Sequence, residues 1–119
     1  MPVKLCYVAN PNWPHVEKWA RWFAAQGGYE VHVLSEAEPA YDGVAWTRLD
    51  IGGPSFLPWI ARAARAFRAA FAAIGPDLVH LHNLEYASVP AAMAWRGPMI
   101  LTTYGLDITL YNAPGSSWR

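Results

Sequence analysis

The sequence has little of three features that would indicate a function directly: cysteine, net charge and long apolar runs. Its one cysteine, Cys6, cannot form an intramolecular disulfide, and no second cysteine offers a metal-binding pair. Lys and Arg together number 9, and Asp and Glu together also number 9. The resulting net charge of zero gives no global field that would attract nucleic acid, so nucleic-acid binding is not expected.

No apolar run is long enough to cross a bilayer, which takes about 18 or more residues. The most apolar region, residues 56–74, is interrupted by Arg62, Arg65 and Arg68. The first residues lack the basic start and long apolar core of a signal peptide. We therefore expect no transmembrane segment and a cytoplasmic location, and peripheral contact with a membrane surface stays open.

Short apolar runs alternate with amphipathic segments along the 119 residues, of which 54% are hydrophobic. The predicted strands are 3–9, 30–35, 44–49, 77–82 and 99–103. The predicted helices are 15–26, 57–74 and 86–95. The order β-α-β-β-α-β-α-β predicts an α/β fold: a Rossmann-like, doubly wound parallel sheet of about five strands with helices on both faces.

The first two predicted helices each have an apolar stripe at helical spacing. On helix 15–26 the stripe is Val16, Trp19, Ala20 and Phe23. On helix 57–74 it is Leu57, Ile60, Ala64, Phe67, Phe71 and Ile74. The three arginines of the second helix fall on its other side, where we expect a solvated face.

Polar side chains follow three of the predicted strands, in the loops 10–15, 80–83 and 102–107. Because ligands bind beyond the carboxyl ends of strands in open parallel sheets, these loops predict the functional site. The candidate substrate-binding residues are Asn12, His15, His82, Asn83, Tyr104, Gly105 and Asp107.

Several of these candidates also have a purely structural explanation. Asn12 is as well suited to capping a turn, and Asp107 to capping the next one. The first loop has no glycine and therefore lacks the dinucleotide-binding fingerprint. His80 and His82 share a face of their strand, but a third metal ligand is missing, so no metal and no cofactor are expected. We interpret His80 as a packed, hydrogen-bonded histidine under a helix, and His82 as the better candidate to contact a ligand.

Four segments of the sequence contain motifs at or beside the predicted strands, and these motifs are informative as a set. The segments are 4–15 (KLCYVANPNWPH), 18–35 (with EVHVLS at its end), 75–82 (GPDLVHLH) and 98–108 (PMILTTYGLDI). In this order and at these separations they resemble glycosyltransferase family 4 proteins, over residues 3 to about 110. His15, His82, Gly105 and Asp107 match the family's pattern, whereas Tyr104 stands where many members have a histidine.

The resemblance implies a GT-B enzyme, in which two Rossmann-like domains enclose a cleft. Residues 1–111 would be an incomplete amino-terminal, acceptor-side domain, and 112–119 a loop or tail. A missing carboxyl-terminal domain would bind the nucleotide-sugar donor. The intact protein would transfer a hexosyl group, with retention of configuration, to a glycan or a lipid-linked acceptor, and the chain alone is not expected to be active.

One alternative comes from a different class of function. A doubly wound domain can also serve as a non-catalytic module that binds a small ligand, or as a subunit that awaits a partner chain or a downstream domain. A stable monomer that binds a nucleotide tightly would favour this alternative over the enzyme.

Overall fold

The centre of the protein is a five-stranded parallel sheet. The computed structural model describes residues 2–52, 57–83 and 87–104. Its strands are β1 (Val3–Val8), β2 (Tyr29–Ser35), β3 (Ala45–Arg48), β4 (Leu78–His82) and β5 (Met99–Thr102). Their order across the sheet is β3-β2-β1-β4-β5, and all four neighbouring pairs are parallel.

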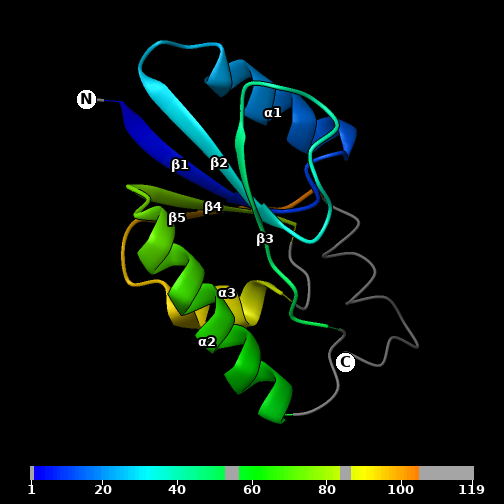
Figure 1. Cartoon of the computed structure of the whole chain (residues 1–119), viewed down its shortest axis with the longest axis vertical. Coiled ribbons are helices and arrows are strands. Elements are labelled where there is room, and N and C mark those ends of the chain that lie inside the picture. The colour runs from blue at the N-terminus through cyan, green and yellow to red at the C-terminus, as the bar shows by residue number, and fades with distance from the viewer. Residues whose placement is uncertain (1, 53–56, 84–86, 105–119) are drawn as a thin grey trace.

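Helices lie on both faces of this sheet. α1 (Pro14–Ala24) lies on one face, whereas α2 (Leu57–Ile74) and α3 (Ser88–Ala94) pack together on the other (Figure 1). The segment 36–44 joins the parallel neighbours β2 and β3 without a helix. The predicted α/β, Rossmann-like fold and its order of elements are therefore confirmed.

β1 divides the core into two clusters, because successive side chains of a strand point to opposite faces. The cluster on the α2 side contains Cys6, Val8, Leu34, Leu49, Phe67, Phe71, Ile74, Val79, Leu81 and Ala91. The cluster on the α1 side contains Leu5, Tyr7, Ala9, Val16, Ala20, Val31 and Val33. Burial on both faces explains why the strands are continuous apolar runs in the sequence.

The element bounds differ from the predicted ones by a few residues. α1 begins one residue earlier, at Pro14, because the first helical position needs no amide hydrogen. α3 spans Ser88–Ala94 instead of 86–95, which places Pro90 in its first turn, where proline is tolerated. Tyr86, the predicted start of that helix, lies outside the described residues.

The apolar stripes of the helices were predicted with two errors. Val16 and Ala20 are buried as predicted, but Trp19 is 44% exposed, because α1 approaches the sheet through small side chains and leaves the indole at the rim. On α2, the buried Trp59 was missed, and its Nε1 donates to the Ile51 carbonyl oxygen at 2.6 Å.

The solvated face of α2 was predicted correctly, since Arg62, Arg65 and Arg68 are exposed. Within the described ranges, none of the helices combines the length and the hydropathy that a bilayer crossing requires.

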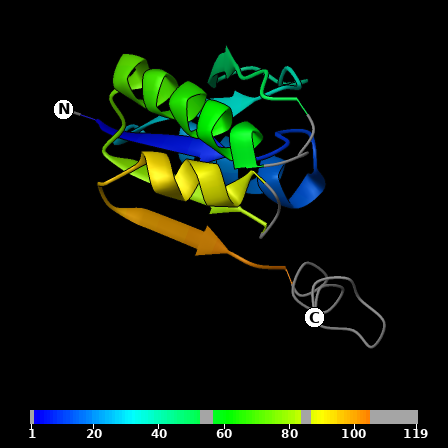
Figure 2. The same ribbon diagram turned by 90° about the horizontal axis from the view of Figure 1, so that it is seen from below.

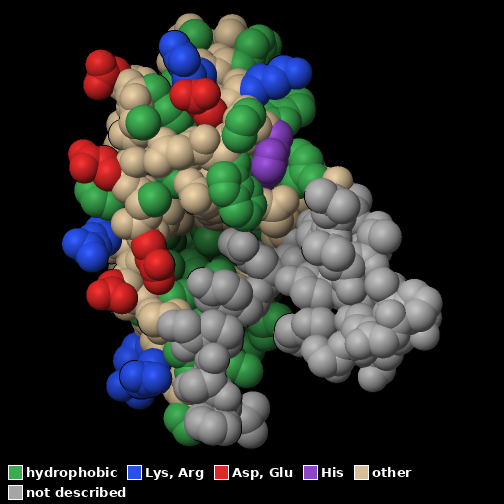
Figure 3. Space-filling model, turned by 90° about the vertical axis from the view of Figure 1, so that its right-hand side faces the viewer, with side chains coloured by type: hydrophobic (Ala, Val, Ile, Leu, Met, Phe, Trp, Pro, Cys, Tyr) green, Lys and Arg blue, Asp and Glu red, His purple; other side chains and the backbone are tan. Residues whose placement is uncertain are grey.

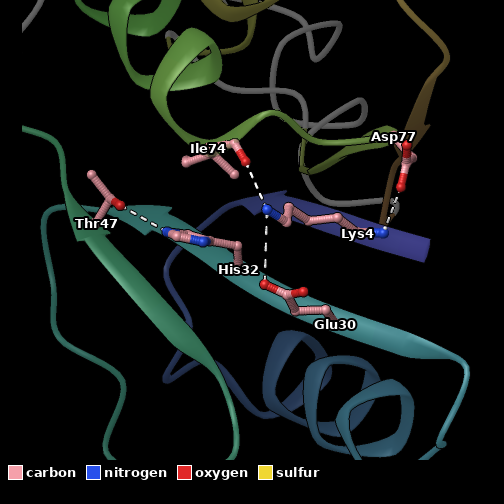
Figure 4. Close-up of polar contacts among 6 residues, drawn as sticks. All are labelled: Lys4, Glu30, His32, Thr47, Ile74 and Asp77. Atoms are coloured by element: carbon pink, nitrogen blue, oxygen red, sulfur yellow. Dashed lines mark hydrogen bonds and ion pairs between the residues drawn. The ribbon is translucent and has the colours of Figure 1, made fainter. Parts of the chain in front are cut away.

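Lys4 joins several elements at the amino edge of the sheet (Figure 4). Its backbone N–H donates to Oδ2 of Asp77 at 2.8 Å, and its Nζ donates to the Ile74 carbonyl oxygen at 2.9 Å. That carbonyl is at the carboxyl end of α2, where the helix dipole favours a cation. Glu30 lies 3.9 Å from the same ammonium group. These contacts fix β1, β2, β4 and α2 at the edge opposite the polar strand-end loops.

β5 is the least covered strand. It lies at the edge of the sheet, away from the helices in Figure 2. Ile100 and Leu101 point to opposite faces, yet they are 47% and 44% exposed. Within the described residues, β5 is therefore held mainly by its pairing with β4.

A matched pair of leucine substitutions should separate the core from this edge. Leu34→Ala should lower the free energy of unfolding by about 2–5 kcal/mol, because Leu34 is fully buried and its loss leaves a cavity. Leu101→Ala should cost less than about 1 kcal/mol, because the side chain is half exposed. Urea denaturation of the two variants measures this difference. Equal losses would contradict the assignment of β5 as a peripheral strand.

Candidate functional site

The loop after β1 is held in place by two asparagines. The Asn10 side-chain oxygen accepts the Asn12 N–H at 3.0 Å, which forms a turn directly after the strand. The Asn12 amide bonds to the segment 36–44, accepting from Ala40 N–H at 2.8 Å and donating to the Glu38 carbonyl oxygen at 3.0 Å. The helix-capping position belongs to Trp13, which makes no side-chain cap bond. The alternative that Asn12 merely caps a turn is therefore wrong, because its amide cross-links two loops.

His15, in the first turn of α1, lies close to the end of β5. Its ring centroid is 4.1 Å from that of Tyr104 and 5.6 Å from that of Trp13. The structure thus brings together two of the predicted site residues, His15 and Tyr104, that are 89 positions apart in the sequence. Their contact requires the first and fifth strands to end at the same edge of the sheet.

The two histidines of β4 are each hydrogen-bonded to a residue at or just after the end of β5. Nε2 of His80 lies 2.6 Å from Oγ1 of Thr102, and Nδ1 of His82 lies 2.7 Å from the Tyr104 hydroxyl. The two imidazole rings stack with centroids 3.9 Å apart. His80 is hydrogen-bonded as predicted, and its ring lies against those of Tyr7 on β1 and His82 on β4.

Tyr7 was missed as a site residue. It is opposite His80 in the β1–β4 pairing, and its ring lies 5.3 Å from the His80 ring and 4.8 Å from the His82 ring. In the sequence it looks like one more residue of an apolar strand. Only the pairing of β1 with β4 shows that its hydroxyl lies among the histidines, so no sequence signal would have identified it.

Several polar atoms of this cluster are buried without a hydrogen-bond partner among the described residues. They are the Tyr7 hydroxyl, Nε2 of His15, Nε2 of His82 and Nδ2 of Asn83. A buried polar group without a partner costs about 1–3 kcal/mol. A bound molecule with hydroxyl or carbonyl oxygens could satisfy these atoms, and this makes the cluster the candidate site.

His80 and His82 are neutral at physiological pH. Burial, with smaller contributions from His80 and His15, lowers the pKa of His82 to about 3. Burial also lowers the pKa of His80, and it raises the pKa of the Tyr7 phenol above its ordinary value, with neighbouring tyrosines adding to the effect. The site therefore offers hydrogen bonds rather than charge to a ligand.

The tautomer of His82 decides which kind of hydrogen bond it offers. When the Tyr104 hydroxyl donates to Nδ1, the single ring proton lies on Nε2, which then donates to a ligand oxygen. When Nδ1 donates to the hydroxyl instead, Nε2 accepts a hydrogen bond from a ligand hydroxyl. Tyr104 thus sets the chemistry of His82, although the phenol itself is a poor proton acceptor.

Asn83 ends β4 in an unusual backbone conformation. Its φ is 73°, in the left-handed region, which asparagine tolerates better than most residues. Its N–H donates to the Thr102 carbonyl oxygen at 2.9 Å, and its carbonyl oxygen accepts from Oγ of Ser88 at 3.1 Å. Asn83 therefore turns the chain sharply from β4 toward α3, directly beside His82.

The two remaining candidate residues are not described by the structure. Gly105 and Asp107 lie outside the described residues, as does the tail 112–119. In residues 2–52, 57–83 and 87–104, no group of three or more His, Cys, Asp or Glu side chains is arranged to hold a metal ion. The buried Cys6 is no nucleophile in this fold, since burial raises the pKa of its thiol to about 12.

Comparison with known families is informative at this point. The sequence matches the family described as glycosyl transferase 4-like over residues 4–118, which is nearly the whole chain. The chain belongs to the glycosyl transferase 4-like family. No curated protein matches the sequence in a direct comparison.

Membership in the glycosyl transferase 4-like family agrees with the resemblance found at the strand ends. Of the residues on which the resemblance rests, His15 and His82 fall within the described ranges, and they form one cluster of rings with Tyr104. In this glycosyl transferase 4-like chain, the Tyr104 hydroxyl is bonded to His82.

The stability of this glycosyl transferase 4-like chain should depend on pH through His82. Its pKa falls from an ordinary 6.5 to about 3 on folding. Between these values the unfolded chain binds a proton that the folded chain does not bind. The free energy of unfolding should therefore fall as the pH falls, by up to about 1.4 kcal/mol per pH unit for this one group.

Urea denaturation at pH 7, 6, 5 and 4 measures this dependence. His82→Gln should lower the slope of the free energy of unfolding against pH by close to the value for one bound proton. Lys18→Gln, on the exposed side of α1, should leave this slope unchanged. The same slope in wild type and His82→Gln would show that His82 is not buried as a neutral ring.

Proposed function

We propose that this chain is the acceptor-side part of a retaining glycosyltransferase. In the intact protein, a hexosyl group would pass from a nucleotide-sugar donor to a glycan or a lipid-linked acceptor. Membership in the glycosyl transferase 4-like family supports sugar transfer. Retention, the donor-binding second domain and the acceptor class follow from the resemblance to glycosyltransferase family 4 and are part of the proposal, as is a cytoplasmic location.

The observation that carries the proposal is the convergence of three strand-end loops on one buried polar cluster. His15 comes from the first turn of α1, directly after the loop that follows β1, His82 from the end of β4 and Tyr104 from the segment just after β5. Open parallel sheets bind ligands at this edge, beside the change in strand order. Here that change lies between β1 and β4, the strands that carry Tyr7 and His82.

The chemistry of the cluster suits positioning more than proton transfer. A histidine with a pKa near 3 is a weak base at neutral pH, so His82 would act by orienting oxygen atoms of the reacting groups. Correct orientation of two substrates is itself a large contribution to the rate. The amino end of α1 contributes little to binding a departing diphosphate, because Pro14 has no N–H and the N–H groups of Val16 and Glu17 donate to the Trp13 carbonyl oxygen.

The decisive test joins the chain to the sequence encoded downstream of codon 119. The longer protein is incubated with radiolabelled nucleotide sugars and candidate acceptors, and the anomeric configuration of the product is determined by NMR. Transfer with retention supports the proposal. Downstream sequence without a second Rossmann-like domain, or a product of inverted configuration, would overturn it.

The alternative of a non-catalytic binding module has its own outcome. Isolated residues 1–119 are analysed by size-exclusion chromatography and titrated with nucleotide sugars. A stable monomer that binds a nucleotide tightly supports the module, because the proposal places donor binding outside this chain.

Tyr104 gives a sharper test of the cluster within the longer protein. Tyr104→Phe keeps the ring beside His15 but removes the hydrogen bond to His82, and we expect kcat/KM to fall between about threefold and tenfold. Tyr104→His, which restores the residue common in the family, should retain more activity than Tyr104→Phe.

Tyr29→Phe is the matched control, since Tyr29 is an exposed tyrosine at the amino edge of the sheet. Kinetic measurements are compared with urea midpoints, so that a loss of stability is not mistaken for a loss of orientation. If Tyr104→Phe and Tyr29→Phe have the same kcat/KM, the Tyr104–His82 bond does not serve transfer.

A further inference from the structure

Apart from the histidine cluster, a hollow lies at the carboxyl edge of the sheet, on the α2 side. It has a volume of about 260 Å³. Its base is apolar and includes Leu34, Leu49 and Phe67, which belong to the α2-side core. Figure 3 faces this edge and shows a recess with hydrophobic side chains in it.

The rim of the hollow is different in character. Trp13 forms one wall and is 38% exposed, so its indole is accessible to a ligand. Glu36 and Asn10 also line the rim, and Glu36 is exposed. Among the described lining residues, Glu36 is the only charged one, and it forms no ion pair with another described residue.

Of the polar groups that line the hollow, the Ser35 hydroxyl is not available to a ligand. It donates to the Ala37 carbonyl oxygen at 2.7 Å and receives Nε1 of Trp46 at 3.2 Å. The serine is therefore occupied by the protein itself. The Glu36 carboxylate and the Asn10 amide nitrogen make no hydrogen bond within the described residues, and both can reach a ligand at the rim.

An exposed indole, a carboxylate and an amide above an apolar base fit a sugar ring. A pyranose has an apolar C–H face that packs on an indole, and hydroxyls that donate to a carboxylate and accept from an amide. Pockets for larger ligands have volumes of roughly 300–1,000 Å³, so this hollow is suited to a single ring. A lone carboxylate at the rim disfavours an anionic ligand, because two like charges would be brought together.

We propose that this hollow is the acceptor subsite and takes one uncharged sugar ring, stacked on Trp13 with hydroxyls on Glu36 and Asn10. That the ring belongs to the acceptor rests on the function proposed above. Acceptors with a carboxylate or a phosphate on this ring are disfavoured by Glu36.

The position of Trp13 connects this subsite to the histidine cluster. Its ring centroid lies 5.6 Å from that of His15, whose own ring lies 4.1 Å from that of Tyr104. The hollow and the cluster are on opposite sides of the sheet, and the loop after β1 separates them. Trp13, which belongs to that loop, therefore lies between a sugar in the hollow and the His15 ring of the cluster.

The test uses the ¹⁵N-labelled 119-residue chain and follows its assigned tryptophan indole N–H signals by NMR. The probes are the methyl α-pyranosides of glucose, galactose and mannose, the charged methyl α-glucuronide, and n-hexanol as a purely apolar probe. At least one neutral glycoside should shift the Trp13 signal. At pH 7 the glucuronide should bind about tenfold more weakly than the methyl glycoside of glucose.

Two variants, each with a matched control, test whether Trp13 and Glu36 contact the bound sugar. Trp13→Ala should weaken binding about tenfold or more, whereas Trp22→Ala, on the outer face of α1, should bind as wild type does. Glu36→Gln should abolish the discrimination against the glucuronide, and the nearby exposed Glu38→Gln should preserve it. Glu36→Gln keeps the proposal testable if Trp13→Ala fails to fold.

The results separate this proposal from the proposed function. A Trp13 signal that no neutral glycoside shifts, or that only n-hexanol shifts, overturns the sugar subsite. Binding that is unchanged in Trp13→Ala and discrimination that persists in Glu36→Gln also overturn it. Sugar binding in the hollow without transfer by the longer protein would leave the subsite intact and reject its role in a transferase.

Discussion

The central strand β1 is the constraint on which the rest of the structure depends. It pairs with β2 on one side and with β4 on the other, and its side chains alternate between two cores. Because all strands are parallel, every carboxyl end lies at one edge, and the loops that leave them are brought together. Lys4 fixes the opposite edge of the sheet.

Burial gives the histidine cluster its chemical character. An imidazole that loses water becomes harder to protonate, and a second imidazole stacked at 3.9 Å adds to the effect. His80 and His82 are therefore neutral, and the hydrogen bond to the Tyr104 hydroxyl is coupled to which nitrogen of His82 carries the proton. A tyrosine in this position can replace a histidine in orienting a neighbour, although it cannot replace one as a base. The hollow beside Trp13 has a different character, with one carboxylate over an apolar base.

Much of the fold was predictable because it depends on local patterns. Short apolar runs bounded by turn residues predicted the strands, and Gly75 lies at the end of α2 with a φ of 64°, as a helix-ending glycine should. Trp19 was assigned wrongly and Trp59 was left out of its stripe, since helical spacing cannot tell which bulky side chain fits against the sheet. The site was predicted in part: His15, His82 and Tyr104 meet, whereas Asn12 cross-links two loops.

The sequence by itself determined the order of elements, the parallel sheet and the family, because periodicity, turn residues and strand-end motifs are all local in the chain. Only the tertiary structure decided which side chains share a site. Tyr7 joins the histidines through strand pairing, and Trp13 and Glu36 meet at one hollow although 23 positions separate them. Such contacts depend on strand order and on the face to which each residue points, and both are set by how the helices cover the sheet.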